Sequence, residues 1–309
     1  MRVLVTGANG FLGSSVVRSL AAAGHDVTGA DLAVPVPPVP GVRHLVVDVT
    51  DAALVDDAFA GTRPEVVVHL ASIVTPGRGS TRELEYRVDV DGSRHVLDAC
   101  LAHGVRRIVV SSSGAAYGYH ADSPAWITED QPVRGNAEFA YSHHKRLVEE
   151  MLAAARAERP ELEQVVLRIG TILGEKVDNQ ITALFERPRL LKIRGADSPF
   201  VFVWDTDVTA VIERAVTADA PGVYNVAGDG TLTVGEIAAR LGKPVLTVPE
   251  PVLRWALRLA RPLGLTPYGP EQTRFLRFRP VLDNTRLKTV FGYTPSKTTA
   301  EAFEAWRTR

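Results

Sequence analysis

The chain has 309 residues, with 35 basic and 36 acidic side chains and a net charge of −1. Charges of both signs are spread along the sequence, so no basic tract predicts binding to nucleic acid or to a membrane surface. The single cysteine excludes an internal disulfide, and no apolar run approaches the roughly 18 residues that cross a bilayer. Because the first motif starts at Gly7, leaving no room for a signal peptide, we expect a cytoplasmic protein with a small-molecule substrate.

The first thirteen residues predict a nucleotide-binding turn. Arg2 to Thr6 is an aliphatic run typical of a buried parallel strand, and Ser14 to Ala23 has the pattern of a helix. Gly7, Gly10 and Gly13 lie between them. Such a turn places bare backbone amides at the positive end of a helix dipole, where a pyrophosphate binds only if no side chain blocks it. The alternative is an ordinary structural turn, which the flanking strand and helix disfavour.

The second predicted strand, Asp26 to Asp31, ends in a carboxylate that can accept hydrogen bonds from both adenosine ribose hydroxyls. No Arg or Lys follows between Leu32 and Gly41 to attract a 2′-phosphate, so the sequence favours NAD over NADP. The alternative is that Asp31 only caps a loop. The prolines between Ala33 and Pro40 predict that this loop is irregular.

The first half of the chain continues to alternate strands with helices. These are strands at Val42–Val47, Glu65–Leu70, Val105–Val110 and Gln164–Ile169, and helices at Ala52–Ala60, Thr81–His103 and Ala140–Glu158. Residues 114 to 139 are rich in Gly, Pro, Asp and Asn and predict an irregular active-site segment. The alternation predicts an α/β fold, a Rossmann-type doubly wound parallel sheet, over residues 1–174.

Beyond Gly174 the elements become short and are separated by prolines. The predicted strands are Leu190–Ile193 and Val223–Val226, and the predicted helices are Thr206–Ala218, Val234–Leu241, Pro251–Ala260, Pro270–Phe275 and Thr298–Thr308. We expect residues 175–309 to form mostly a smaller C-terminal substrate-binding lobe, with segments that return to the Rossmann core. The side chain of Cys100 is interpreted as a small core or interface residue. Core packing is also the interpretation of an apolar stripe in Pro251–Ala260, which consists of Leu253, Trp255, Ala256, Leu257 and Leu259.

Tyr141 and Lys145 lie four residues apart in a predicted helix, so their side chains project from one face. A nearby ammonium, together with an oxidised nicotinamide ring, is expected to bring the phenol pKa from about 10 toward neutrality. Tyr141 would then exchange a proton with a carbinol oxygen that Ser113 holds by a hydrogen bond. His69, His143 and His144 are interpreted as structural, and Glu129 and Asp130 as capping or solvated residues. No cluster with ligand spacing predicts a metal site.

A set of motifs follows in order along the chain: GANGFLG from Gly7, HLA from His69, SSSGAAYG from Ser111, YSHHK from Tyr141 and LRIGTILG from Leu167. On these motifs the chain resembles the extended short-chain dehydrogenases/reductases, the NAD-dependent epimerase/dehydratase family that includes UDP-glucose and UDP-galactose 4-epimerases. The resemblance covers essentially the whole chain. It implies NAD as cofactor, hydride exchange with a secondary alcohol or ketone carbon, and a homodimer formed through helices 81–103 and 140–158.

The resemblance also assigns site residues. It implies that Ser113, Tyr141 and Lys145 are catalytic. Tyr141 and Lys145 would also bind the cofactor, with Gly7, Gly10, Phe11, Leu12, Gly13, Asp31, Asp48, Val49, Leu70, Ala71, Ser111 and Ile169. The implied substrate-binding residues are Thr75, Ser113, Gly114, Thr171, Phe200 and Arg274.

Several positions depart from the family pattern. Gly114 and Ala115 replace the Asp-Glu pair of the 4,6-dehydratases, which disfavours elimination chemistry. Thr171 stands where relatives that act on sugar nucleotides have Asn, and Phe200 stands where they have an Arg that grips the diphosphate. Asp89 also replaces an Asn. The arginines that could replace the missing one are Arg274, Arg277 and Arg279.

Three functions therefore remain open. The first is a (nucleotide-)sugar epimerase or ketoreductase, for which the family resemblance argues. The second is a dehydrogenase or reductase of a less polar, non-nucleotide hydroxy or keto compound, for which the missing Arg and Asn argue. The third is a non-catalytic NAD-sensing protein, against which the intact Ser113, Tyr141 and Lys145 argue.

Overall fold

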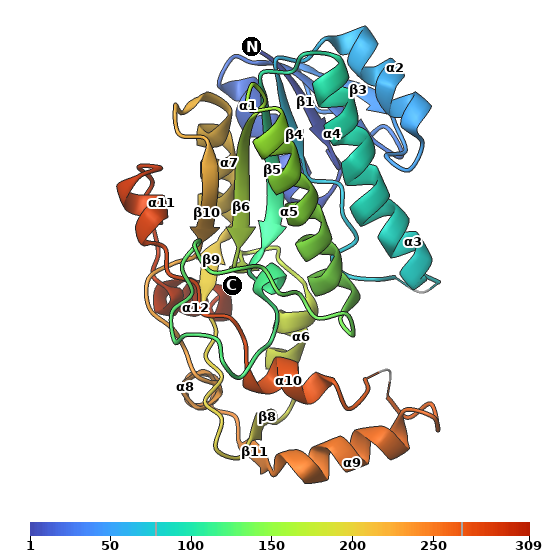
Figure 1. The fold of residues 1–309 in the computed structure, drawn as a ribbon. Helices are drawn as coiled ribbons and strands as arrows, with labels where there is room; N and C mark the ends of the chain where they lie inside the picture. The colour runs from blue at the N-terminus through green and yellow to red at the C-terminus, as the bar shows by residue number, and fades with distance from the viewer. Residues whose placement is uncertain (78, 267) are drawn as a thin grey trace.

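The computed structural model describes residues 1–77, 79–266 and 268–309. Its centre is a seven-stranded sheet in the order β10-β6-β5-β4-β1-β2-β3, and every pairing is parallel (Figure 1). The strands are β1 (Arg2–Thr6), β2 (Asp26–Asp31), β3 (Val42–Val46), β4 (Val66–His69), β5 (Arg107–Ser113), β6 (Glu163–Ile169) and β10 (Gly222–Val226). The order reverses between β1 and β4, and in open α/β sheets ligands bind at the carboxyl ends of such strands. The predicted Rossmann-type sheet is confirmed.

Helices cover both faces of this sheet (Figure 1). On one face α1 (Phe11–Ala22) and α7 (Asp205–Thr217) pack against side chains such as Val5 and Val68. On the other face α2 (Ala52–Thr62), α4 (Gly92–Ala102) and α5 (Ala140–Glu158) pack against Leu4 and Ile108. Because successive strand residues point to opposite faces and both faces are covered, the strands have nearly continuous apolar sequences. Cys100 is buried in the second of these cores, as predicted.

The single predicted helix Thr81–His103 is wrong in its middle. The structure has α3 (Arg82–Tyr86), a π-helical segment η1 (Arg87–Asp91) and then α4. π-Helical turns occur mostly as local insertions in α-helices, often at functional sites. Here the turn carries the buried Asp89, whose hydrogen bonds reach the segment after β4, and these non-local contacts favour the irregular turn.

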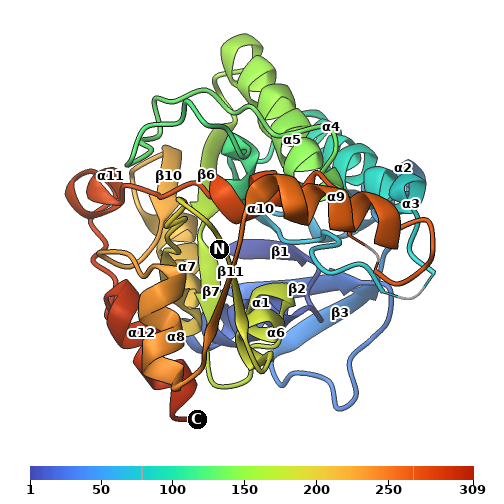
Figure 2. The same cartoon turned by 90° about the horizontal axis from the view of Figure 1, so that it is seen from below.

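Beyond β6 the chain builds a second, smaller core. Two parallel strand pairs, β7 with β9 and β8 with β11, form it together with short helices and the side chains of Phe185, Phe202 and Phe303. The elements, with one short helix from before β6, are η2 (Gly114–Tyr117), β7 (Thr171–Leu173), α6 (Gln180–Glu186), β8 (Leu190–Ile193), β9 (Phe202–Trp204), α8 (Val234–Leu241), β11 (Val245–Val248), α9 (Glu250–Ala260), α10 (Gln272–Arg277), α11 (Thr285–Thr289) and α12 (Thr299–Arg307). Seen from below, α9 and α10 lie across the carboxyl edge of the sheet (Figure 2). Strand β10 and helix α7 return to the central sheet and its cover.

The core interpretation of the Pro251–Ala260 stripe is wrong. No residue of α9 is buried, and the side chain of Trp255 is 65% exposed. Helix α9 packs mainly against the short α10, which covers too little of it to bury more than part of Leu253 and Leu257. Within the described residues, no helix is both long enough and apolar enough to span a membrane.

Candidate active site

The glycine turn between β1 and α1 is closely packed. A Cβ on Gly7, where φ is +69°, would lie 2.6 Å from the amide nitrogen of Ala71. A Cβ on Gly13 would lie 2.0 Å from the carbonyl oxygen of Gly7. Only glycine fits at these two positions. Gly10 begins α1 without a side-chain cap, so the amides of the first turn remain available to an anion. The turn therefore fits the pyrophosphate of a dinucleotide.

Asp31 is fixed at the end of β2 by two backbone amides. Asn9 of the glycine turn donates to Oδ2 over 2.8 Å, and Leu32 donates to Oδ1 over 2.7 Å. A carboxylate oxygen can accept more than one hydrogen bond, so both oxygens retain capacity for ribose hydroxyls. Asp31 thus caps its loop and is also placed to bind ribose. After β3, Asp48 accepts from the Thr50 amide over 2.9 Å, and Val49 packs against Gly92.

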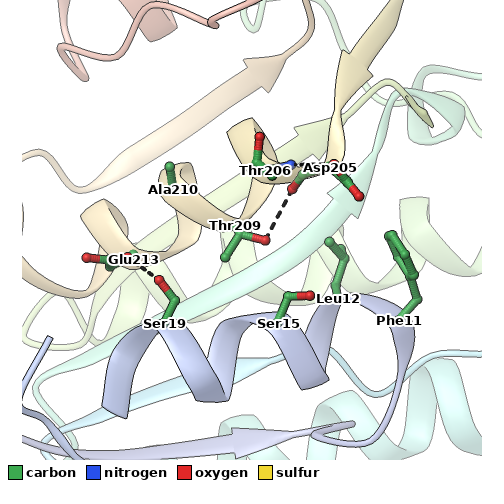
Figure 3. Close-up of a pocket in the computed structure, with 9 residues that line it drawn as sticks. All are labelled: Phe11, Leu12, Ser15, Ser19, Asp205, Thr206, Thr209, Ala210 and Glu213. Atoms are coloured by element: carbon green, nitrogen blue, oxygen red, sulfur yellow. Dashed lines mark hydrogen bonds between the residues drawn. The ribbon is translucent and has the colours of Figure 1, made fainter. Parts of the chain in front are cut away.

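Phe11 and Leu12, both predicted to bind the cofactor, line a hollow between α1 and α7 (Figure 3). Asp205 and Glu213 line its other wall, and Ser19 donates a hydrogen bond to Glu213 across it. Two carboxylates make this hollow unfavourable for a pyrophosphate. None of the catalytic candidates lines this hollow, and Ser113 lies instead at the carboxyl end of β5.

The three predicted catalytic side chains come together from two elements. Ser113 ends β5, where it pairs in register with Ile169 of β6, and its hydroxyl lies near enough to Tyr141 of α5 to lower the pKa of that phenol. Lys145 lies one helical turn farther along α5, and its Nζ is 5.5 Å from the centroid of the Tyr141 ring. The ammonium donates to the carbonyl oxygen of Ser111 over 2.9 Å. The arrangement can hold a substrate oxygen between a hydroxyl and a phenol.

Burial dominates the electrostatics of this group. It raises the pKa of the Tyr141 phenol, the hydrogen bond with Ser113 opposes this, and the charge of Asp89 adds to the rise. Burial also lowers the pKa of Lys145, while Asp89 and Glu149 act in the opposite direction. In the protein by itself, burial therefore outweighs the groups that lower the pKa of the phenol. The expected shift toward neutrality also requires the positive charge of an oxidised nicotinamide ring, and it stays a prediction. Without a bound cofactor, Tyr141 keeps its proton.

Asp89 and His144 form a buried pair beside the catalytic group, which the sequence analysis did not find. The Nδ1 of His144 lies 3.0 Å from Oδ2 of Asp89, while Ser72 and the amide of Ile73 each donate to Oδ1 over 2.9 Å. Burial alone would raise the pKa of Asp89, but these hydrogen bonds and Lys145 hold it below its usual range. The carboxylate thus ties α5 to the segment after β4. The signal was an Asp in place of the family's Asn.

A second buried network joins β5 and β6 to α5, beside the predicted catalytic residues. Arg168 of β6 donates to Oε2 of Glu149 from Nη2 over 2.7 Å and from Nε over 2.9 Å, and Nε also lies 3.1 Å from Oε1. Its Nη1 lies 2.7 Å from the hydroxyl of Tyr117. Ser112 donates to Glu149 over 2.5 Å, which joins β5 to α5. Two signals were available in the sequence. Arg168 interrupts an apolar strand, and Glu149 continues the four-residue spacing of Tyr141 and Lys145.

Three other polar residues of the region, His69, Glu129 and Asp130, lie in different environments. His69 is structural as predicted, because its ring nitrogens lie 2.7 Å from Thr6 Oγ1 and 2.9 Å from Ser93 Oγ. The interpretation of Glu129 as a capping or solvated residue is wrong. Its side chain is buried and accepts a hydrogen bond from the Asn225 amide over 2.8 Å. Asp130 is exposed and pairs with an arginine.

The predicted substrate residues lie in different surroundings. Gly114 follows Ser113 directly and packs against Leu282, and Thr171 begins β7 just after Ile169. Thr75 is exposed in the segment after β4. Phe200 is only 4% exposed and belongs to the core of the smaller lobe, and Arg274 is exposed and pairs with Glu138 at 2.9 Å. In the described ranges no group of three or more His, Cys, Asp and Glu side chains could hold a metal ion.

Comparison with known proteins identifies relatives of the whole arrangement. The profile of the NAD dependent epimerase/dehydratase family matches residues 3–227. An uncharacterized protein of Mycobacterium tuberculosis is 30% identical over 244 residues. The match covers 78% of this chain and 64% of the mycobacterial protein, so this chain spans less than two-thirds of the length of that relative. The 3-diazoavenalumate denitrifying reductase of a Streptomyces species is 28% identical over 316 residues and 96% of both chains. The Thermus thermophilus UDP-glucose 4-epimerase, solved with NAD, is 25% identical with a TM-score of 0.74 over 100% of this chain and 98% of its own. The chain therefore belongs to the NAD dependent epimerase/dehydratase family.

Proposed function

We propose that the enzyme exchanges a hydride with a secondary alcohol or ketone carbon, with Ser113, Tyr141 and Lys145 as its catalytic residues. The observation that carries the proposal is the grouping of Tyr141, Ser113 and Lys145 at the carboxyl end of β5, where the Lys145 ammonium lies 5.5 Å from the Tyr141 ring and is held by the carbonyl oxygen of Ser111. NAD, when bound, supplies the hydride chemistry. The glycine turn, Asp31 and Asp48 are the residues that would hold it.

Tyr141 can serve as the proton donor when a ketone is reduced. Because its pKa is raised, the phenol keeps its proton and can give it to an oxygen on which negative charge develops. Ser113 supports the same oxygen by a hydrogen bond. Lys145 is held by the carbonyl oxygen of Ser111, so its charge remains beside the phenol ring.

We favour a reductase or dehydrogenase of a non-nucleotide keto or hydroxy compound. Phe200 is buried and Arg274 is neutralised by Glu138, so neither position offers a guanidinium to a diphosphate. The Streptomyces relative, which matches nearly the whole chain, is also named a reductase. A (nucleotide-)sugar epimerase is the second candidate, and the likeness to the Thermus UDP-glucose 4-epimerase supports it.

The test is turnover with NADH and a panel of aryl and alkyl ketones, compared with UDP-sugars. We expect net oxidation of NADH by a ketone, and we expect Tyr141→Phe to lower kcat by about 10²- to 10⁴-fold while leaving the Kd for NADH unchanged. Tyr268→Phe, at an exposed tyrosine, is the matched control. Conversion of a UDP-sugar without net change in NADH would establish the epimerase instead. NADH binding without turnover on any substrate would favour a non-catalytic NAD sensor.

We also propose a homodimer formed through the helices of residues 81–103 and 140–158. The support is the family resemblance of these two segments. Sedimentation velocity across a range of protein concentrations tests the proposal, and a monomer at every concentration would refute it.

A further inference from the structure

Arg279 lies in an aromatic environment at the border of the smaller lobe. Its guanidinium carbon is 3.7 Å from the centroid of the Phe200 ring and 5.4 Å from that of Phe275. Nη2 donates to the carbonyl oxygen of Ser198 over 2.5 Å. Burial lowers the pKa of Arg279 to about 9, so the side chain remains charged at neutral pH. A buried charge of this kind is costly unless it is paired.

Among the described residues, Arg279 has no carboxylate partner, and its buried Nε has no hydrogen-bond acceptor. The buried Nε of Arg277 also has no acceptor, but both neighbouring arginines have a carboxylate partner. Arg274 pairs with Glu138, and Arg277 pairs with Glu250. Of the three arginines between residues 274 and 279, two are thus paired with carboxylates of the protein itself. The charge of Arg279 is left for an anion from outside the protein.

Aromatic side chains connect Arg279 to the catalytic group. The Tyr119 ring contacts Phe275 edge-on at 5.3 Å and Phe139 at 5.0 Å. Phe139 is the N-cap residue of α5, two positions before Tyr141. Tyr119 lies near both Arg279 and Tyr141. A molecule that reaches from Arg279 to the Tyr141 phenol would therefore pass along aromatic surface.

We propose that Arg279 binds a carboxylate of the substrate, which is thus a keto or hydroxy acid with an apolar, aromatic-compatible body. This inference rests on the proposed hydride exchange at Tyr141 and specifies its substrate class. Guanidinium and carboxylate form strong paired hydrogen bonds, and the planar guanidinium can remain stacked on Phe200 while it does so. A single free guanidinium suits one compact anionic group and leaves a diphosphate largely unpaired.

The experiment measures binding without turnover. The enzyme saturated with NADH is titrated calorimetrically with 3-phenylpropionate, with its neutral amide 3-phenylpropionamide, and with UDP. We expect the acid to bind more tightly than the amide or UDP. Arg279→Met should weaken binding of the acid by about ten- to one-hundred-fold and leave binding of the amide unchanged. Arg261→Met is the matched control, because Arg261 is exposed in the same lobe and pairs with Glu271.

Arg279→Lys provides an independent test if the Met variant fails to fold, because it keeps the charge and loses the planar fork. We expect this variant to bind the acid about tenfold more weakly than the wild type and to bind the amide equally well. Equal binding of the acid by wild type and either variant would overturn the proposal, as would tighter binding of UDP that depends on Arg279. Failure of 3-phenylpropionate to bind the wild type would also overturn it. Binding through Arg279 without any ketone reduction would refute only the proposed hydride exchange.

Discussion

His69 should make the stability of this enzyme strongly dependent on pH. The ring is 3% exposed at the end of β4, and both nitrogens are engaged by the hydroxyls of Thr6 and Ser93. Burial lowers the pKa of His69 from 6.5 to about 3, the charge of Lys145 acts in the same direction, and Asp89 opposes it. The folded protein thus holds a neutral imidazole at pH values where the unfolded chain would bind a proton.

The sign and size of the effect follow from these two pKa values. The contribution of His69 is fully present above pH 6.5 and is lost as the pH falls from 6.5 toward 3. Each pH unit in this window costs about 1.4 kcal/mol of the free energy of unfolding. At pH 5.0 the loss relative to pH 7.5 is therefore about 2 kcal/mol.

The assay is urea unfolding followed by tryptophan fluorescence at pH 7.5 and pH 5.0, for the wild type and His69→Gln. Glutamine offers a donor and an acceptor but does not titrate. The variant should lose about 2 kcal/mol less than the wild type between the two pH values, whatever its stability at pH 7.5. A difference below about 0.5 kcal/mol would refute the reasoning, and so would a His69 resonance that titrates in the folded protein near pH 6.5.

Two further predictions concern the buried network and the glycine turn. Glu149→Gln leaves Arg168 buried without its charge partner and should lower the free energy of unfolding, measured in urea, by about 3–5 kcal/mol. Glu161→Gln is the control, because it breaks an exposed pair with Arg159 and should cost less than about 1 kcal/mol. Equal costs for the two variants would contradict the role given to burial. Gly13→Ala places a Cβ 2.0 Å from the Gly7 oxygen. It should lower the free energy of unfolding by about 1–3 kcal/mol and weaken NADH binding in a fluorescence titration. Gly61→Ala in α2 is the control, because its Cβ would meet no atom within 4 Å, and it should be neutral or stabilising. Unchanged NADH affinity in Gly13→Ala would show that the turn does not hold the cofactor.

The central sheet was predictable because its signals are local. Buried parallel strands have continuous apolar sequences. The glycine turn marks the end of β1, and the amphipathic pattern marks both ends of α5, so the predicted bounds of these two elements agree with the structure. The three-residue strands β7 and β9 were missed, since such short segments have no periodicity and form only by pairing with each other. The exposed α9 was misread because an apolar stripe indicates which face is apolar and does not show whether another element covers it.

The candidate site was predictable only in part. Tyr141 and Lys145 follow from helical spacing, and Ser113 follows from its place at the end of a strand. The Asp89–His144 and Glu149–Arg168 pairs join residues 55 and 19 positions apart, and no local pattern predicts such partners. The effect of burial on the pKa of Tyr141 was also not predictable, because that burial comes from the packing of the whole site.

The π-helical turn at Arg87–Asp91 limits how this region can change in length. A π turn contains one residue more per hydrogen-bonded ring than an α turn. Deleting one residue here would let ordinary helical bonds close, but everything on the N-terminal side would rotate by about 100° relative to α4. The capping hydroxyl of Thr81 would leave its place, or else Asp89 would turn away from His144. Residues 74–77 are exposed, so we expect a change of length there to disturb the fold less than one in the helix that follows.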